Sequence, residues 1–377
     1  MKYPSFVALL CLSFAFAASQ AAEPHAIKIG VQIPLTGERA AVGRLMRNGV
    51  HMAADAINSR ADDNGISVEL VLQDDGSRAD GALKSAQALA GDAQILAILG
   101  EINSPLVRAG APVIDEAGVP YLTAGSSPRT TAASKWIFRA GAGDSLMADL
   151  LTRYLVENLH VKSYAILHDK AGIHNQRSDT IAALLSERYG LKALVNGKWS
   201  PGDTEFRPAL KQIEEQHPMV LLAFGESQEG PTFLKQATAL HMETQIVTQR
   251  DFGVQRVLDL AGPASEGMIV ITEYAPELQG SATQAWNVEY GKRFGGGANV
   301  IAAQYYDALM LVAEAAKTGG ASRIGIQSGL RQLKGYPGIV GDYTFDASRN
   351  GVHRFFIARV ISGKLSRVTV LEENPRQ

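Results

Sequence analysis

Residues 95–128 read ILAILGEINSPLVRAGAPVIDEAGVPYLTAGSSP, which predicts two buried strands with one helix between them. The continuous apolar run at 95–100 is typical of a strand covered on both faces of a parallel sheet. Asn103 or Ser104 can cap the helix, which continues to about residue 117, and residues 119–123 form the next strand. Both strands end in small and hydroxyl residues, first GEINSP and then AGSSP.

Adjacent parallel strands deliver the loops that follow them to the same edge of a sheet. Ser104, Ser126, Ser127 and several free backbone N–H groups are therefore expected to gather there. In open α/β sheets this edge is where small ligands bind. A helix N-terminus flanked by hydroxyls suits an anion such as a carboxylate. The segment thus predicts recognition of a small molecule with an anionic group.

The start of the chain has the pattern of an export signal. A basic Lys2 precedes an apolar run of about a dozen residues at 6–17, which is too short to span a bilayer. Small residues at 19 and 21 predict cleavage before Ala22, with Glu23 as the alternative, so residues 1–21 are expected to be a signal peptide. The only cysteine, Cys11, lies inside it. We therefore expect a cysteine-free mature protein in the periplasm, held together by its core without disulfides.

Composition limits the partners and the number of domains. A formal net charge of −2 without a basic cluster argues against nucleic acid as a partner. The mature chain of about 356 residues is long enough for two domains. Strands and helices alternate in two runs, roughly 26–140 and 141–274, which favours parallel sheets with helices on both faces. The long helices after residue 282 need a sheet to cover, so we expect the chain to return to the first domain.

The individual elements follow from hydrophobic periodicity and turn residues. Strands are expected at 27–33, 68–73, 95–100, 119–123, 136–139, 163–168, 191–199, 219–224, 244–248, 267–272, 341–345 and 355–362. Helices are expected at 45–59, 78–90, 104–117, 145–158, 174–189, 206–216, 230–240, 282–294, 301–318 and 327–333.

Several motifs resemble those of the periplasmic solute-binding proteins for branched-chain amino acids, in order along the whole mature chain. They are IKIGVQIPLTG, QDDGSRADGALKSAQAL, ILGEINSP with VPYLTAGSSP, ILHDK and AGPASEGMIV. The resemblance implies the type I periplasmic binding fold: two doubly wound α/β domains with parallel sheets, joined by three crossovers and closing as a hinge. The crossovers would fall near 139–141, 272–274 and 345–350. The domains would then be 26–140 plus 275–345, and 141–274 plus 346–377.

The resemblance also implies which first-domain residues touch the solute. Ser104 matches the serine that contacts the ligand carboxylate. Ala124 and Ser126 match a backbone carbonyl and a hydroxyl that contact the carboxylate and the ammonium. The neighbouring Ile102, Asn103 and Gly125 complete the candidate loops. As an alternative, Ser104 is merely a helix N-cap that contributes about 1 kcal/mol, and the two roles are compatible.

The second domain departs from the pattern for amino acids. Ile173, with His174 beside it, occupies the position of an aromatic residue, and Glu226 replaces a tyrosine. Arg250 aligns with the glutamate that pairs with the ligand ammonium, and Asp251 follows it. An arginine there attracts an anion, whereas a shift of one residue restores the acid at Asp251, and Glu226 is another source of negative charge. Arg250 as a solvated loop charge remains an equal alternative.

The ligand stays open among aliphatic amino acids, aromatic acids, dicarboxylates and amides. The resemblance implies a membrane ABC permease as partner and a monomeric, non-catalytic binding protein. No cofactor or metal is expected, since the eight histidines show no HExxH spacing and Asp74-Asp75 suits a turn and helix start.

Two other functions compete with solute delivery. One is a ligand sensor or amide-responsive regulator of the same fold. The other is an exported hydrolase, which is disfavoured because His168-Asp169 has no accompanying G-x-S-x-G nucleophile. Turnover of ester or amide substrates would distinguish the hydrolase.

Overall fold

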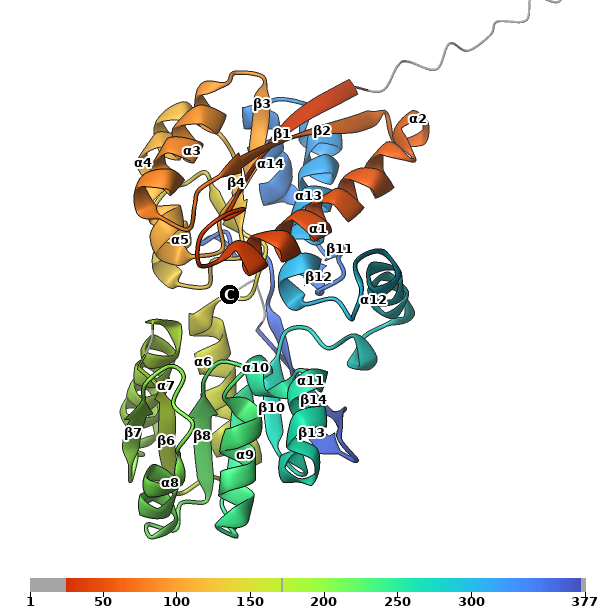
Figure 1. The fold of residues 1–377 in the computed structure, drawn as a ribbon. Helices are drawn as coiled ribbons and strands as arrows, with labels where there is room; N and C mark the ends of the chain where they lie inside the picture. Colours follow the sequence, from red (N-terminus) through yellow and green to blue (C-terminus); the bar gives the residue numbers. More distant parts are fainter. Residues whose placement is uncertain (1–24, 171, 374–377) are drawn as a thin grey trace, which may run out of the picture.

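A computed structural model describes residues 25–170 and 172–373, which form two α/β domains (Figure 1). The expected signal peptide at 1–21 lies outside the described residues. Within the described ranges, no helix combines the length and apolar content that a membrane span requires.

The first sheet has five parallel strands in the order β2-β1-β3-β4-β5. β3 lies at the centre, with Ala97 and Leu99 in the core on one face and Ile95 and Ile98 in the core on the other. This doubly covered position explains why the strand is apolar throughout. The strands are β1 (His25–Ile33), β2 (Ile66–Asp74), β3 (Ile95–Leu99), β4 (Tyr121–Thr123) and β5 (Ile137–Arg139).

Helices cover both faces of this sheet. α3 packs against α4 on one face, and α13 packs against α1 and α14 on the other. The late helices therefore return to the first sheet, as the sequence predicts. The helices associated with this domain are α1 (Ala40–Asn58), α2 (Ala61–Asn64), α3 (Ala79–Gly91), α4 (Ser104–Ala117), α5 (Pro128–Ala132), α12 (Ser281–Phe294), α13 (Val300–Gly319) and α14 (Arg323–Gln332).

The second sheet has seven strands in the order β14-β13-β10-β9-β8-β6-β7. Five of these strands are parallel to one another, namely β10, β9, β8, β6 and β7. By contrast, β13 is antiparallel to both β10 and β14. β13 and β14 thus add an antiparallel edge to an otherwise parallel sheet. The strands are β6 (Tyr164–Asp169), β7 (Asn196–Trp199), β8 (Val220–Phe224), β9 (Gln245–Gln249), β10 (Ile269–Thr272), β13 (Arg354–Ile361) and β14 (Lys364–Glu372).

The helices of the second sheet also form two layers. α6 and α7 share the large core with one face of the sheet, and α8, α9 and α11 enclose a separate core on the other. They are α6 (Asp144–Arg153), continued by a π-helical turn (Tyr154–Asn158), α7 (Gly172–Tyr189), α8 (Arg207–Glu214), α9 (Gly230–Ala239), α10 (Arg250–Gly253) and α11 (Gln255–Ala261).

Several elements differ from the sequence expectations. Those not predicted are α2, α5, α10, α11, β11 and β14. The strand expected at 191–199 begins only at Asn196, and the one expected at 341–345 is the short β12 (Asp342–Tyr343), which pairs with β11 (Tyr336–Pro337) outside both large sheets.

The chain passes between the sheets after β5, after β10 and before β13. The first and third passages run side by side, because Arg139 N–H donates to the Arg349 carbonyl at 2.9 Å and Gly351 N–H donates to the Arg139 carbonyl at 3.0 Å. We propose that the domains follow the sheets, with limits of 26–140 plus 275–345 and 141–274 plus 346–377.

Candidate functional site

The two serine-bearing loops of the first domain meet at the carboxyl edge of the sheet. Asn103 caps α4 through its side chain, which accepts from Leu106 N–H at 3.4 Å. The Ser104 hydroxyl is left to accept from Ser127 N–H at 3.3 Å. Gly125 lies so close that an added Cβ would be 3.2 Å from both the Ser104 hydroxyl and the Ile102 carbonyl oxygen. The structure thus brings the predicted loop residues together, and Asn103 rather than Ser104 is the cap.

A buried acid, Glu101, holds these loops in place through hydrogen bonds. Glu101 accepts from Asn103 N–H at 2.7 Å, and its own N–H donates to the Tyr121 hydroxyl at 2.9 Å. The Thr123 hydroxyl joins the loops, because it donates to the Glu101 carbonyl and accepts from Gly125 N–H. Burial, followed by the neighbouring carboxyl of Asp75, raises the pKa of Glu101 to about 8. The sequence reasoning missed Glu101, although it directly follows the diagnostic strand.

Ser126 links the first domain to the first crossover. Its hydroxyl donates to Asp144 Oδ2 at 2.9 Å, and its carbonyl accepts from Asp144 N–H at 3.0 Å. The Arg139 guanidinium donates to the carbonyls of Ser126 and Ser127 at 2.9 and 2.6 Å. Ala124 is buried directly before this loop. Hydrogen bonds therefore link the conformation of this loop to the first passage between the domains.

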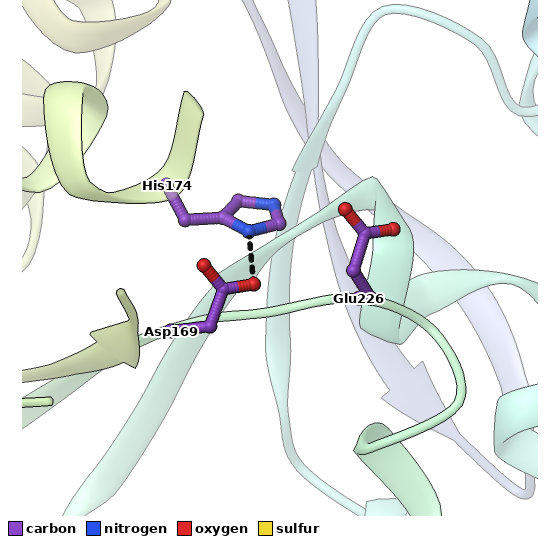
Figure 2. Close-up of side chains that lie close together, drawn as sticks. All are labelled: Asp169, His174 and Glu226. Carbon is purple, nitrogen blue, oxygen red and sulfur yellow. Dashed lines mark hydrogen bonds and ion pairs between the residues drawn. The ribbon is translucent and has the colours of Figure 1, made fainter. Parts of the chain in front are cut away.

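The second domain contributes a charged cluster at the ends of β6 and β9. The His174 side chain, 2% exposed in the first turn of α7, is bonded through Nδ1 to Asp169 Oδ2 at 2.7 Å (Figure 2). Its Nε2 lies 3.9 Å from Asp251 Oδ2. Burial disfavours the imidazolium, but the hydrogen bonds with Asp169 and Asp251 outweigh it and raise the pKa of His174 to about 9. At neutral pH His174 is the cation between two carboxylates.

Glu226 follows β8, and its carboxylate lies beside the His174 ring and close to Asp169 (Figure 2). It is exposed, and within the described part of the chain its carboxylate has no hydrogen bond or ion pair. Desolvation and repulsion from Asp251 raise the pKa of Glu226, against the attraction of His174. Among the described residues, the Glu226 carboxylate thus lacks a hydrogen-bonded or ion-paired cation.

Asp169, His174 and Glu226 each offer a metal-ligand atom, and these atoms lie within 4.8 Å of one another. However, a metal would have to displace a proton from His174, whose pKa of about 9 keeps the ring charged at neutral pH. The cluster already contains its cation, so we assign no metal to it.

Arg250 is paired with an acid of the second domain. It begins α10, and its Nη1 donates to Glu273 Oε1 at 2.5 Å, while Asp251 is only 3.9 Å from its Nε. The charge of Arg250 is therefore balanced within the protein. Of the two residues left open, Asp251 is the one beside His174. Ile173, at the start of α7, is exposed.

A second arginine joins the crossover to the sheet. Arg177, one turn after His174 on α7, donates to Asp144 Oδ1 at 2.7 Å and to Gln249 Oε1 at 2.5 Å. A small cavity of about 20 Å³, lined by Asp144, Arg177, Gln249 and the Arg250–Glu273 pair, lies here. Asp144, Arg177, Gln249 and Glu273 were all missed from the sequence.

The two domains face each other through the ends that carry these loops (Figure 1). α5 lies at the lower end of the first domain, and α6, α7 and α10 lie at the upper end of the second (Figure 1). Residues 26–364 match the family model described as periplasmic binding protein. The chain belongs to the periplasmic binding protein family.

Known relatives agree with this assignment. This binding protein is 23% identical to the Leu/Ile/Val-binding protein homolog 2 of Brucella abortus, over 85% of the chain and 86% of that relative. It shares its fold with the branched-chain amino acid transporter substrate-binding protein of Streptococcus pneumoniae in complex with isoleucine (24% identity, 92% and 99% of the two chains, TM-score 0.76). A solute-binding protein of an ABC transporter from R. palustris in complex with benzoate is similarly close in fold (19% identity, 92% and 96%, TM-score 0.75).

The fold is that of the type I periplasmic binding proteins with two domains, as the sequence motifs predict. The general role is solute binding rather than catalysis, in agreement with the relatives, which are binding proteins by name.

Proposed function

We propose that this periplasmic binding protein captures a small carboxylate-bearing solute, an amino acid or a related organic acid, between its domains and delivers it to a membrane ABC permease. The meeting of the Ser104 and Ser126 loops at the N-terminus of α4 carries the proposal. Backbone N–H groups and hydroxyls at a helix start are suited to a carboxylate. The isoleucine and benzoate held by two proteins of the same fold both carry that group.

The second domain supplies the half of the proposed site that closes over the solute. Its side chains at the ends of β6, β8 and β9 contact the solute only when the domains approach each other. Contacts made in the closed form alone shift the open–closed equilibrium towards closure. Arg139 and Asp144 lie between the first-domain loop and the crossover, so the bound loop and the hinge are connected by direct hydrogen bonds.

The compartment follows from the family and from the signal pattern at the N-terminus. We propose that the mature protein works in the periplasm, where a permease in the inner membrane reads the closed form. The name of the family model supports this location.

A thermal-shift screen of the purified mature protein against amino acids and organic acids tests the proposal. A ligand at a hundred times its dissociation constant stabilises the folded state by about 2.7 kcal/mol, which is easily measured as a higher Tm. Failure of the whole panel to raise the Tm, together with no saturable heat in calorimetry, would reject carboxylate-solute capture.

The variant Ser104→Ala tests whether the Ser104 hydroxyl contacts the ligand. Its loss should weaken binding of the screened ligand. Because Ser104 does not cap α4, the Tm of the free protein should change little. Ser328→Ala on α14, outside the candidate loops, is the matched control and should bind normally. Unchanged affinity in Ser104→Ala would remove this hydroxyl from the site.

A further inference from the structure

The end of β9 carries a buried amide with one unsatisfied atom. Gln249, the last residue of β9, is 4% exposed. Its Oε1 accepts from Arg177 Nη1 at 2.5 Å, whereas its Nε2 has no hydrogen-bond partner within the described residues. Because an arginine can only donate, the amide oxygen must face Arg177, which identifies Nε2 as the unpaired atom. A buried donor without a partner is unfavourable, so this N–H group is suited to an acceptor that the chain itself does not supply.

A free acceptor lies in the same place. Glu273, which directly follows β10 and is 7% exposed, accepts from Arg250 Nη1 through Oε1 at 2.5 Å. Its other oxygen, Oε2, accepts no hydrogen bond from the part of the chain that the structure describes. Gln249 and Glu273 therefore offer one donor and one acceptor on neighbouring strands.

Both side chains line the small cavity of about 20 Å³. This volume holds about one water molecule, so the cavity admits the end of a side chain rather than a whole solute. Among the described residues that line it, the charged ones are Asp144, Arg177, Arg250 and Glu273. Arg177 is paired with Asp144 and Arg250 with Glu273, so the charges of the cavity wall balance within it. Balanced walls favour an uncharged group.

The cavity adjoins the first-domain half of the proposed site. Asp144 in its wall accepts from the Ser126 hydroxyl at 2.9 Å and from Arg177 Nε at 2.7 Å. Gln249 directly precedes α10, which lies at the end of the second domain that faces the first (Figure 1). A solute held at the Ser126 loop is therefore able to extend its side chain towards Gln249.

The donor and the acceptor together distinguish between side-chain groups. A carboxamide brings a carbonyl oxygen for Gln249 Nε2 and an N–H group for Glu273 Oε2. A carboxylate brings acceptors only, and the acids Asp144 and Glu273 would repel it. An apolar group would leave the buried donor unpaired. A water molecule makes the same two hydrogen bonds as a carboxamide, which would displace it without losing either.

We propose that Gln249 is a specificity-determining residue and that the protein prefers amino acids whose side chain ends in a carboxamide. The inference rests on the proposed function, since it assumes that the solute lies between the domains. The first-domain loops hold the carboxylate of the solute, and Gln249 with Glu273 binds the amide at the other end.

Two sets of ligands with nearly the same shape test this preference by calorimetry on the mature protein at neutral pH. L-asparagine is compared with L-leucine and L-aspartate, and L-glutamine with L-homoleucine and L-glutamate. The members of a set differ in the group that would enter the cavity. We expect the carboxamide to bind about tenfold more tightly than the apolar and the acidic member.

Two variants of Gln249 test whether this residue makes the distinction. Gln249→Glu keeps an oxygen for Arg177 and replaces Nε2 by a second oxygen, so carboxamide binding should weaken about tenfold while the affinity for the apolar member is unchanged. Gln249→Met removes both polar atoms at nearly the same length and should give the same loss without an added charge. The Tm of each variant verifies that it folds.

Gln212→Glu is the matched control, because it makes the same change at an exposed position of α8. It should leave the preference for the carboxamide intact.

Four results would overturn the inference. They are equal affinities within each set, tightest binding by the acidic members, an equal loss for all ligands in the Gln249 variants, and an unchanged preference in both variants. The last result would mean that Nε2 faces a bound water only. In each case the proposed function stands as long as one acid binds, whereas no saturable binding by any member of the wider acid panel would remove the proposed function itself.

Discussion

Glu101 and Asp75 form a pair of carboxyl groups that are almost fully buried beneath the candidate loops, 0% and 1% exposed. One oxygen of each, Glu101 Oε2 and Asp75 Oδ2, has no other hydrogen-bond partner within the described residues. Burial raises the pKa of both groups, and that of Glu101 reaches about 8. Two adjacent buried carboxyls are stable when they share a proton, because two like charges in a poorly solvated site repel each other.

This pair predicts a stability that falls as the pH rises. The pKa of Glu101 is 4.5 in an unperturbed chain and about 8 in the folded protein. Between these values the folded state binds more protons than the unfolded state, so its stabilisation is complete below the lower value and is lost as the pH rises through the higher one. Glu101→Gln mimics the protonated acid and should flatten this dependence in urea unfolding at pH 5 and pH 8.

Glu116→Gln, an exposed acid on α4, is the control for Glu101→Gln and should keep the slope of the native protein. An unaltered slope in Glu101→Gln would show that the pair does not hold a proton.

A second prediction at the residue scale concerns His174. Asp169→Asn removes the closest carboxylate from the ring, so the pKa of His174 should fall from about 9 towards 6.5. NMR titration of the histidine ring protons measures the change, with circular dichroism to verify folding. Asp179→Asn, an exposed acid on the same helix, should not shift it. A pKa that stays near 9 would assign the effect to Asp251 instead.

At the scale of elements, two neighbouring residues at the start of α4 have different roles. Asn103 caps the helix and Ser104 faces the neighbouring loop. Asn103→Ala should destabilise the protein by about 1 kcal/mol or less, since the capping bond is long at 3.4 Å. Asn103→Ser keeps a capping oxygen and should unfold like the native protein. A large loss in both variants would indicate a role other than capping.

The sequence predicted the elements that are long or strongly patterned. β3 and α4 match residues 95–117 closely because the run of apolar side chains and the capping residues agree. α10 and α11 were missed because they are only 4 and 7 residues long, too short for a helical period to show. β14 was missed because its residues alternate weakly between partial burial and exposure.

A signal for β14 was nevertheless present. Ser362 and Gly363 both have positive φ, 52° and 72°, and join β13 to β14. A two-residue turn of this kind is typical of a β-hairpin, and Ser-Gly is one of its dipeptides.

The candidate site was predictable in its first-domain half only. Consecutive loops of a parallel sheet must meet at one edge, so Ser104 and Ser126 could be placed from sequence. The pairing of Arg250 with Glu273, or of Arg177 with Asp144, depends on how strands and helices far apart in the chain are packed. No local spacing encodes such pairs, so the sequence alone could not show that Arg250 lies beside Glu273.

At the scale of the whole molecule, ligand binding should make the protein more compact. Domain closure shortens the molecule along the axis that joins the domains, so small-angle scattering should give a smaller radius of gyration at saturating ligand. Ser104→Ala at the same ligand concentration should remain closer to the free form. An identical radius of gyration with and without bound ligand would contradict hinge closure.

Arg139 donates to two loop carbonyls while its own backbone pairs with the third passage between the domains. We therefore expect variation in the 126–127 loop to alter the rate of domain opening and closing together with the affinity. Under the proposed function, variation at Glu226, which has no hydrogen bond to this passage, would alter ligand preference and leave that rate unchanged.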